Sequence, residues 1–314
     1  MPFVILLFAL FASLFTLSKS ALGFSEPFFL IGSRMALAGV VLLAHQLVFN
    51  RSQFLLALKY FMPLLLLGLL NIYLTNAAEI WGLQYMSSAK ACLIYSLSPF
   101  LAAFVAYLVL KEKLTPKKWA GLILGFVGLI PILFVGNANN ELVSDMFHEM
   151  TYLSWPEVAL LIAVISSVYG WILLKKVVKH YHLSPIMANG VSMLIGGILA
   201  LAHSYLSHES WSPIPIASGY YMPFLEITIW MTLISNVICY NLYGHLLKTF
   251  SATFMSLAGL VTPLFATFFG WYFLEEDITW HYFASMMIFS VGLFVFYQEE
   301  LAHSVREKKA ALSH

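Results

Sequence analysis

The sequence is poor in charge. Of its 314 residues only 10% are Asp, Glu, Lys or Arg, whereas 61% are hydrophobic. A soluble domain carries about 25% charged residues, so this chain has too few polar groups to cover a surface in water. The shortage excludes an ordinary soluble protein and favours a chain that lies in the lipid bilayer. With a net charge of +1 and no extended basic patch, nucleic acid is excluded as a partner.

Motifs for metal or cofactor chemistry are missing as well. The two cysteines, Cys92 and Cys239, both lie in apolar stretches, so we interpret them as buried apolar residues and not as a disulfide framework. His148-Glu149 lacks the second histidine of a zinc-protease motif. We find no Gly-rich nucleotide loop and no paired catalytic motif. We therefore predict no metal, no cofactor and no enzymatic activity.

Long apolar segments, in contrast, are abundant. A helix needs about 20 mostly apolar residues to cross the hydrocarbon core. The first such segment lacks a preceding basic region and a clear cleavage site, so we expect a retained helix and not a signal peptide. The segments predict ten transmembrane spans, at residues 2–18, 28–48, 61–82, 88–110, 117–136, 157–174, 185–204, 223–246, 251–274 and 280–298.

The distribution of charge agrees with ten spans. With a cytoplasmic N-terminus, most of the 16 basic residues fall on the cytoplasmic side, namely Arg51, Lys59, Lys111, Lys113, Lys117, Lys118, Lys175, Lys176, Lys179, Lys248, Arg306, Lys308 and Lys309. The opposite side collects acidic residues, namely Glu141, Asp145, Glu149, Glu209, Glu275, Glu276 and Asp277. This is the pattern of the positive-inside rule. It predicts a multi-pass protein of the bacterial cytoplasmic membrane with both termini in the cytoplasm.

The two halves of the sequence resemble each other. A shift of 164 residues places Ser98-Pro99 on Thr262-Pro263 and Gly128 on Gly292 without a gap. A shift of 158 places Pro27 on Pro185 and, likewise, Gly32 on Gly190. Because each half holds five spans, an odd number, the second half enters the membrane with inverted orientation, as in carriers that alternate access around a site at the midplane.

The repeat predicts the fold class and the domain boundaries. We expect an all-α integral membrane protein with ten transmembrane helices, arranged as two inverted five-helix repeats around a central cavity. The predicted parts are a first repeat at 1–136, an extracytoplasmic linker at 137–156, a second repeat at 157–298 and a cytoplasmic tail at 299–314.

Two short motifs resemble a known family. Leu110-Lys-Glu-Lys-Leu-Thr115 follows the Ser-Pro of the fourth span, and Leu274-Glu-Glu-Asp-Ile-Thr279 follows the Thr-Pro of the ninth. Both resemble a hallmark of EamA-type members of the drug/metabolite transporter superfamily, and the likeness covers about residues 2–298. The resemblance implies a ten-helix basket whose cavity is lined mainly by spans 1, 3, 4, 6, 8 and 9.

The resemblance also implies a function. Members of this superfamily carry amino acids, nucleosides, drugs or other metabolites, and some in intracellular bacteria carry S-adenosylmethionine. We expect a secondary transporter for a small amphipathic or zwitterionic metabolite, working by alternating access, with the substrate and membrane lipid as partners. A lipid flippase or a multidrug exporter on the same fold is the alternative. The protein could be a monomer or a homodimer, since Gly121-x-x-x-Gly125 permits close helix contact within the bundle or between copies.

Ionisable residues inside the spans are the first candidates for the site, because a charge in hydrocarbon needs a partner or water. Glu79 shares one face of an ideal helix with Asn71, Thr75 and Asn76, which predicts a polar face toward the cavity. There Glu79 could bind a substrate amine or a proton, or it could form a fixed ion pair with Arg34 or Lys90.

The remaining candidates lie on other spans. Lys90 either contacts the substrate or extends to the interface. Arg34, about 10 Å into the second span, either ties helices together or clamps a substrate carboxylate. Further cavity-lining candidates are polar or aromatic residues, namely Tyr95, Tyr169, Trp171, Asn236, Tyr240 and Tyr243.

Two prolines are candidates for hinges. Pro99 and Pro263 occupy matching places in the two halves, near the centres of the predicted fourth and ninth spans. Each removes a backbone hydrogen bond, and paired helix breaks in the two halves of a carrier point toward its site.

Overall fold

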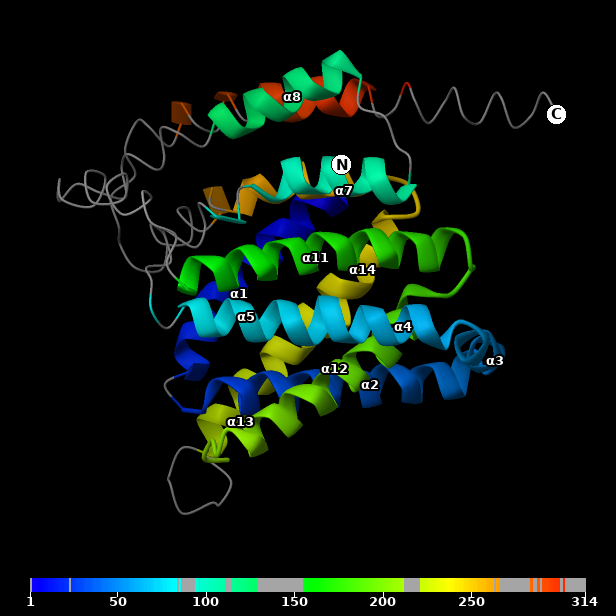
Figure 1. Ribbon diagram of the computed structural model, residues 1–314, viewed down its shortest axis with the longest axis vertical. Helices are drawn as coiled ribbons and strands as arrows, with labels where there is room; N and C mark the ends of the chain where they lie inside the picture. The colour runs from blue at the N-terminus through cyan, green and yellow to red at the C-terminus, as the bar shows by residue number, and fades with distance from the viewer. Residues whose placement is uncertain are drawn as a thin grey trace.

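The computed structural model describes residues 2–22, 24–83, 85, 94–95, 97–110, 115–128, 155–211, 221–262, 264–265, 283–284, 287–288, 290–299 and 302. Across these residues every regular element is a helix (Figure 1). In chain order the first half contains α1 (Pro2–Leu22), α2 (Pro27–Phe49), α3 (Ser52–Lys59), α4 (Phe61–Leu67), η1 (Gly68–Leu74), α5 (Thr75–Leu83), α7 (Ser98–Leu110) and α8 (Pro116–Val127). The second half contains α11 (Trp155–Lys179), α12 (Pro185–Leu206), α13 (Tyr221–Met231), η3 (Thr232–Cys239), α14 (Tyr240–Leu246), α15 (Ala252–Ala258) and η4 (Gly259–Val261).

Five helical segments are long and apolar enough to cross a membrane. They are Pro27–Phe49, Phe61–Gly82, Trp155–Lys179, Pro185–Leu206 and Tyr221–Leu246. Each coincides within a few residues with a predicted span. Shorter apolar helices at Pro2–Leu14, Ser98–Leu108 and Ala252–Val261 fall within three further predicted spans. The structure therefore confirms an all-helical membrane protein, while the count of ten stays a prediction.

The starts of the long helices follow from local sequence. Pro27 and Pro185 occupy the first turns of α2 and α12, where the missing N–H costs nothing. Ser184 caps α12, its hydroxyl accepting a hydrogen bond from the Met187 N–H at 3.1 Å. At the start of α2 the Glu209 carboxylate accepts bonds from the two N–H groups of Phe28 and Phe29, at 3.1 and 2.9 Å. A residue that follows α12 thus completes the first turn of α2.

Charged residues lie at both ends of the bundle. The end that carries α3, at the right of Figure 1, also receives the end of α2 and the turn from α11 to α12. A hollow of about 400 Å³ at this end is lined partly by Lys179, His182 and Lys248. Glu209 lies at the opposite end, at the start of α2. The basic side of the charge pattern is therefore the α3 end.

The lateral surface is apolar. Large side chains such as Val40 on α2, Phe104 on α7 and Ile198 on α12 are more than half exposed. So many exposed large apolar side chains would be unusual on a soluble protein, and they are expected on the lipid-facing surface of a membrane protein. Trp155 and Tyr205 are 80% and 72% exposed near the end opposite α3. Tryptophan and tyrosine are common at the membrane–water interface, and this position near one end of the bundle fits that location.

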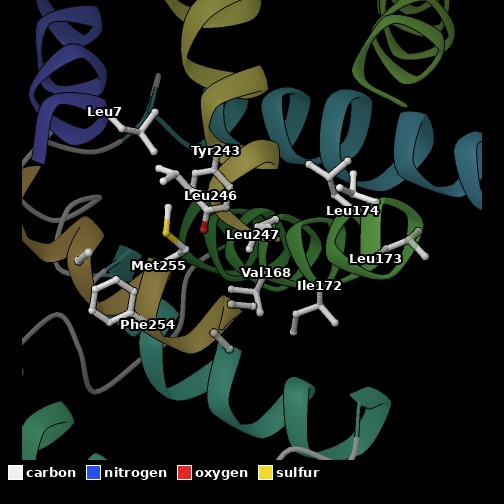
Figure 2. Packing of buried hydrophobic residues seen from close by; sticks show 14 of the residues in the cluster. Leu7, Val168, Ile172, Leu173, Leu174, Tyr243, Leu246, Leu247, Phe254 and Met255 are labelled. Atoms are coloured by element: carbon white, nitrogen blue, oxygen red, sulfur yellow. The ribbon is translucent and has the colours of Figure 1, made fainter. Parts of the chain in front are cut away.

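The largest core cluster joins both halves of the chain. Tyr243 and Leu246 of α14 pack between Leu7 of α1, Met255 of α15 and Ile172 of α11 (Figure 2). All five side chains are at most 8% exposed. The second-half helices α14 and α15 therefore pack against α1, the first helix of the chain, and α11 packs against α14 and α15.

Helices α2 and α12 cross at a close, reciprocal contact. A Cβ added to Gly39 would lie 2.6 Å from the backbone nitrogen of Leu194, and a Cβ added to Gly197 would lie 2.4 Å from that of Ala36. The shift of 158 residues that relates the two halves exchanges Gly39 with Gly197 and Ala36 with Leu194. Each helix therefore uses the same positions toward the other, as two related helices would across a two-fold axis.

The glycines of α8 also pack inside the chain. A Cβ on Gly121 would lie 2.9 Å from the carbonyl oxygen of Gly292, and one on Gly292 would lie 2.5 Å from the backbone nitrogen of Gly125. The sequence motif Gly121-x-x-x-Gly125 permits close helix contact either within the bundle or between two copies. The structure shows the contact within the bundle.

Two long helices change to π-helical geometry at their centres. These segments are η1, between α4 and α5, and η3, between α13 and α14. The shift of 164 residues places the first residue of η1, Gly68, on the first residue of η3, Thr232. π-Helical turns are rare and frequently mark functional sites. The residues where these two segments end are therefore the first candidates for a functional site.

Candidate functional site

Glu79 lies on α5, one turn beyond η1. Its carboxylate oxygen Oε2 accepts a hydrogen bond from the Tyr95 hydroxyl at 2.7 Å. A short bond to a charged acceptor is among the stronger hydrogen bonds in proteins. The structure thus brings together two of the predicted site residues, from the third span and from the residues that precede α7.

Arg34 lies on α2 and is 9% exposed. It is close enough to Glu79 and Tyr240 for its charge to interact with both. Among the described residues, however, no ion pair within 4 Å joins Arg34 to Glu79, and the Nε of Arg34 has no hydrogen-bond partner. The alternative of a direct Glu79–Arg34 ion pair is therefore not what the structure shows. The two opposite charges are close enough for electrostatic interaction but form no direct ion pair.

An aromatic wall adjoins these charges. The rings of Trp171 and Tyr243 are stacked with centroids 3.9 Å apart, and Trp171 also meets Tyr240 at 5.1 Å. From α1, the ring of Phe11 contacts Tyr240 and that of Phe8 contacts Tyr243, both edge-on with centroids 6.3 Å apart. Tyr240 belongs to the wall and also faces Arg34 and Glu79, so it connects the apolar and charged parts of the site.

Asn71 and Thr75 face α11, away from the charges. Asn71 is 2% exposed and packs against Gly170, where an added Cβ would lie 2.3 Å from the Asn71 Cβ. The Thr75 hydroxyl donates to the carbonyl oxygens of Leu70, at 2.9 Å, and Ala163, at 3.5 Å. The predicted polar face assumed a uniform α-helix, and the π-helical segment changes the direction in which these side chains point. Only Asn76 and Glu79 of that face lie beside Tyr240.

An asparagine follows each of the two π-helices. The Asn76 amide donates to the Ile72 carbonyl inside η1 at 2.7 Å, and the Asn241 amide donates to the Val237 carbonyl inside η3 at 2.8 Å. Each asparagine lies two residues beyond the end of its π-helix. Buried Asn189 of α12 adds a bond from its amide to the Asn241 side chain at 3.0 Å. Side-chain amides thus satisfy backbone carbonyls that π-helical geometry frees.

The other predicted residues lie around this centre. Asn236 is fully buried in η3, and its amide lies 2.8 Å from the sulfur of Met35 on α2. Tyr169 is partly buried against the main core cluster. Pro99 lies in the first turn of α7, where a proline removes no helical hydrogen bond. Lys90 and Pro263 lie outside the described residues.

Three side chains of this centre are not among the sequence candidates. Phe8 and Phe11 form part of the aromatic wall, and Asn189 bonds to both Tyr240 and Asn241. The three-residue spacing of Phe8 and Phe11 places both on one face of a helix, and this spacing could have indicated from the sequence that they act together. The signal is a weak one in a chain with 16% aromatic residues.

Long apolar helices, a lipid-facing apolar surface and an internal polar centre define a multi-pass membrane protein of the transporter class. The sequence matches the EamA-like transporter family over residues 1–134 and 154–298, and the chain belongs to this family. The family consists of transporters, not enzymes. The chain is 43% identical over 287 residues to the S-adenosylmethionine/S-adenosylhomocysteine transporter of Chlamydia muridarum, covering 91% of this chain and 86% of that protein.

Further proteins are similar to the chain in sequence or in fold. The protein of the same name in Chlamydia trachomatis serovar D is 42% identical, with 91% of this chain and 84% of that protein covered. The WAT1-related chloroplastic protein At3g02690 of Arabidopsis thaliana is 25% identical, with 83% and 60% covered. A crystal structure with 15% identity superposes with a TM-score of 0.74 over 96% of both chains, which shows a common fold.

Proposed function

We propose that this protein transports S-adenosylmethionine and S-adenosylhomocysteine across the bacterial cytoplasmic membrane. The observation that carries the proposal is the unbonded pair of opposite charges, Glu79 and Arg34, beside the aromatic wall around Trp171. Both ligands combine an α-ammonium, an α-carboxylate and an adenine ring, and S-adenosylmethionine adds a cationic sulfonium. The names of the Chlamydia relatives point to the same substrates.

Each part of such a ligand has a counterpart in the site. The Glu79 carboxylate, oriented by the Tyr95 hydroxyl, suits a cationic group. The stacked rings of Trp171 and Tyr243 suit the adenine ring, since aromatic faces stack on one another at such separations. A lipid flippase would need no pair of opposite charges beside stacked rings, so we favour the zwitterionic nucleoside.

We further propose that ten spans form two inverted repeats, with both termini in the cytoplasm. Three observations support this arrangement. The α2–α12 crossing uses equivalent residues on both helices, the π-helices η1 and η3 begin at equivalent positions, and basic residues gather at the α3 end. That end would be the cytoplasmic one by the positive-inside rule.

Alternating access would then involve bending at η1 and η3, because π-helical turns interrupt the regular α-helical geometry of their spans and frequently occur at functional sites. Asn241→Ala removes the amide that bonds the Val237 carbonyl in η3. We expect this variant to transport several-fold more slowly, with a substrate Kd within about tenfold of wild type. Transport in proteoliposomes and equilibrium binding in detergent measure the two effects.

Pro99→Ala serves as the comparison. If Pro99 is a hinge, as predicted from the sequence, its replacement should slow transport in the same way. Unchanged transport in Asn241→Ala combined with slow transport in Pro99→Ala would move the hinge from η3 to the start of α7. A loss of binding in Asn241→Ala would instead make its amide part of the substrate site.

A ligand panel tests the proposed substrates. A ligand that binds only the folded protein stabilises it by about 2.7 kcal/mol at 100 times its Kd. We expect S-adenosylmethionine and S-adenosylhomocysteine to raise the unfolding temperature of the purified protein in a concentration-dependent way. Methionine or adenosine alone should have little effect. Stabilisation by undecaprenyl phosphate but by neither nucleoside would contradict the proposal and favour a flippase.

A further inference from the structure

Arg34 is an unusual side chain for its location. It lies about seven residues into α2, roughly 10 Å from the start of that helix, and is 9% exposed. Its Nε is buried without a hydrogen-bond partner. A guanidinium carries five N–H donors and is always charged, and a buried charge is costly unless a counter-charge and hydrogen bonds compensate for it.

The neighbours of Arg34 supply a nearby counter-charge but no hydrogen bond to its Nε. The carboxylate of Glu79 accepts a hydrogen bond from the Tyr95 hydroxyl, and the side chain of Tyr240 lies beside that of Asn76. Both groups are close enough for electrostatic interaction with Arg34, and neither forms an ion pair with it within 4 Å in the part of the chain that the structure describes. The guanidinium therefore keeps donors for a planar acceptor with two oxygens.

We propose that Arg34 binds the α-carboxylate of the transported amino-acid nucleoside, an inference that rests on the proposed function. Arginine and carboxylate form two parallel N–H···O bonds, which fix orientation as well as affinity. With the carboxylate on Arg34 and the ammonium toward Glu79, the amino-acid end of the substrate would bridge the two opposite charges. Arg34 would then select for ligands that retain the carboxylate.

The test compares two ligands that differ in this one group, S-adenosylhomocysteine and its decarboxylated analogue S-adenosyl-3-thiopropylamine. We expect wild type to bind S-adenosylhomocysteine at least about tenfold more tightly. In Arg34→Met, which keeps the length of the side chain without its charge, the ratio of the two Kd values should fall to about one. Binding is measured by isothermal titration calorimetry on purified protein.

Matched variants separate the carboxylate contact from a general effect. Ser33→Ala changes a side chain that bonds only to its own helix, at the Leu30 carbonyl, and should leave the ratio unchanged. Arg34→Lys keeps the charge but loses the two-bond geometry, so its ratio should lie between those of wild type and Arg34→Met. An unchanged ratio in Arg34→Met would overturn the inference.

Other outcomes are equally decisive. If wild type binds neither ligand, the proposed function fails, and the role of Arg34 falls with it. If wild type binds both ligands equally, the proposed function stands and the carboxylate contact is wrong. If Arg34→Met fails to fold and Arg34→Met with Glu79→Gln restores the fold, Arg34 is a structural partner of Glu79, which also overturns the inference.

Discussion

Glu79→Gln is expected to fold normally and to lose at least about tenfold in affinity for S-adenosylmethionine, or about 1.4 kcal/mol. Glutamine keeps an oxygen that can accept the Tyr95 hydroxyl bond but removes the charge that would attract a cationic ligand. Folding should survive because no ion pair within 4 Å joins Glu79 to any described residue. Calorimetric titration measures the affinity, and thermal unfolding of the unliganded protein measures the fold.

Tyr95→Phe is the control for this prediction. It removes the hydroxyl that orients Glu79 and leaves the charge in place, so we expect a smaller loss of affinity than in Glu79→Gln. A different result would follow if Glu79 were mainly structural. Removing its charge would then leave a buried positive charge alone, at a cost of about 3–5 kcal/mol, and the variant would be poorly folded before any ligand is added.

Gly197→Ala is expected to destabilise the protein by about 1–3 kcal/mol, the usual cost of overpacking. Its new Cβ would lie 2.4 Å from the backbone nitrogen of Ala36, so that α2 and α12 would have to move apart. Gly39→Ala should cost a similar amount, since its Cβ would lie 2.6 Å from the backbone nitrogen of Leu194. Thermal unfolding in detergent gives both values.

Gly190→Ala is the matched control on the same helix. The nearest atoms to its Cβ would be side-chain atoms of Leu42 and Leu43, at 3.2 Å, so a shift of a few tenths of an ångström would accommodate it. The variant should lose much less stability than Gly197→Ala. Equal losses at the two positions would contradict the close α2–α12 crossing, and an undiminished stability of Gly197→Ala would do so as well.

The positions of the helices could be predicted from hydrophobicity alone, because a span in lipid needs an uninterrupted apolar segment. The predicted segment 28–48 and the observed α2, Pro27–Phe49, differ by one residue at each end. The π-helices could not be predicted in this way, since the apolar residues of η1 and η3 are the same ones that an α-helix would use.

That difference also explains which part of the site was found. Glu79 was conspicuous because a carboxylate is rare in a span, whereas the direction of Asn71 depended on a uniform helical phase that η1 interrupts. Phe8 could not be separated from the many other aromatic residues without knowing that α1 packs against Tyr243. Site residues whose charge is unusual inside a span could be predicted from the sequence. Site residues whose role depends on how the helices pack could not.

The central claim concerns transport, and the most direct measurement is uptake of radiolabelled S-adenosylmethionine into proteoliposomes that contain the purified protein, with and without S-adenosylhomocysteine inside. The account predicts saturable uptake that external S-adenosylhomocysteine competes for and that Glu79→Gln strongly reduces at low substrate concentration. Uptake no greater than in protein-free liposomes, under exchange conditions and under an imposed gradient alike, would contradict it.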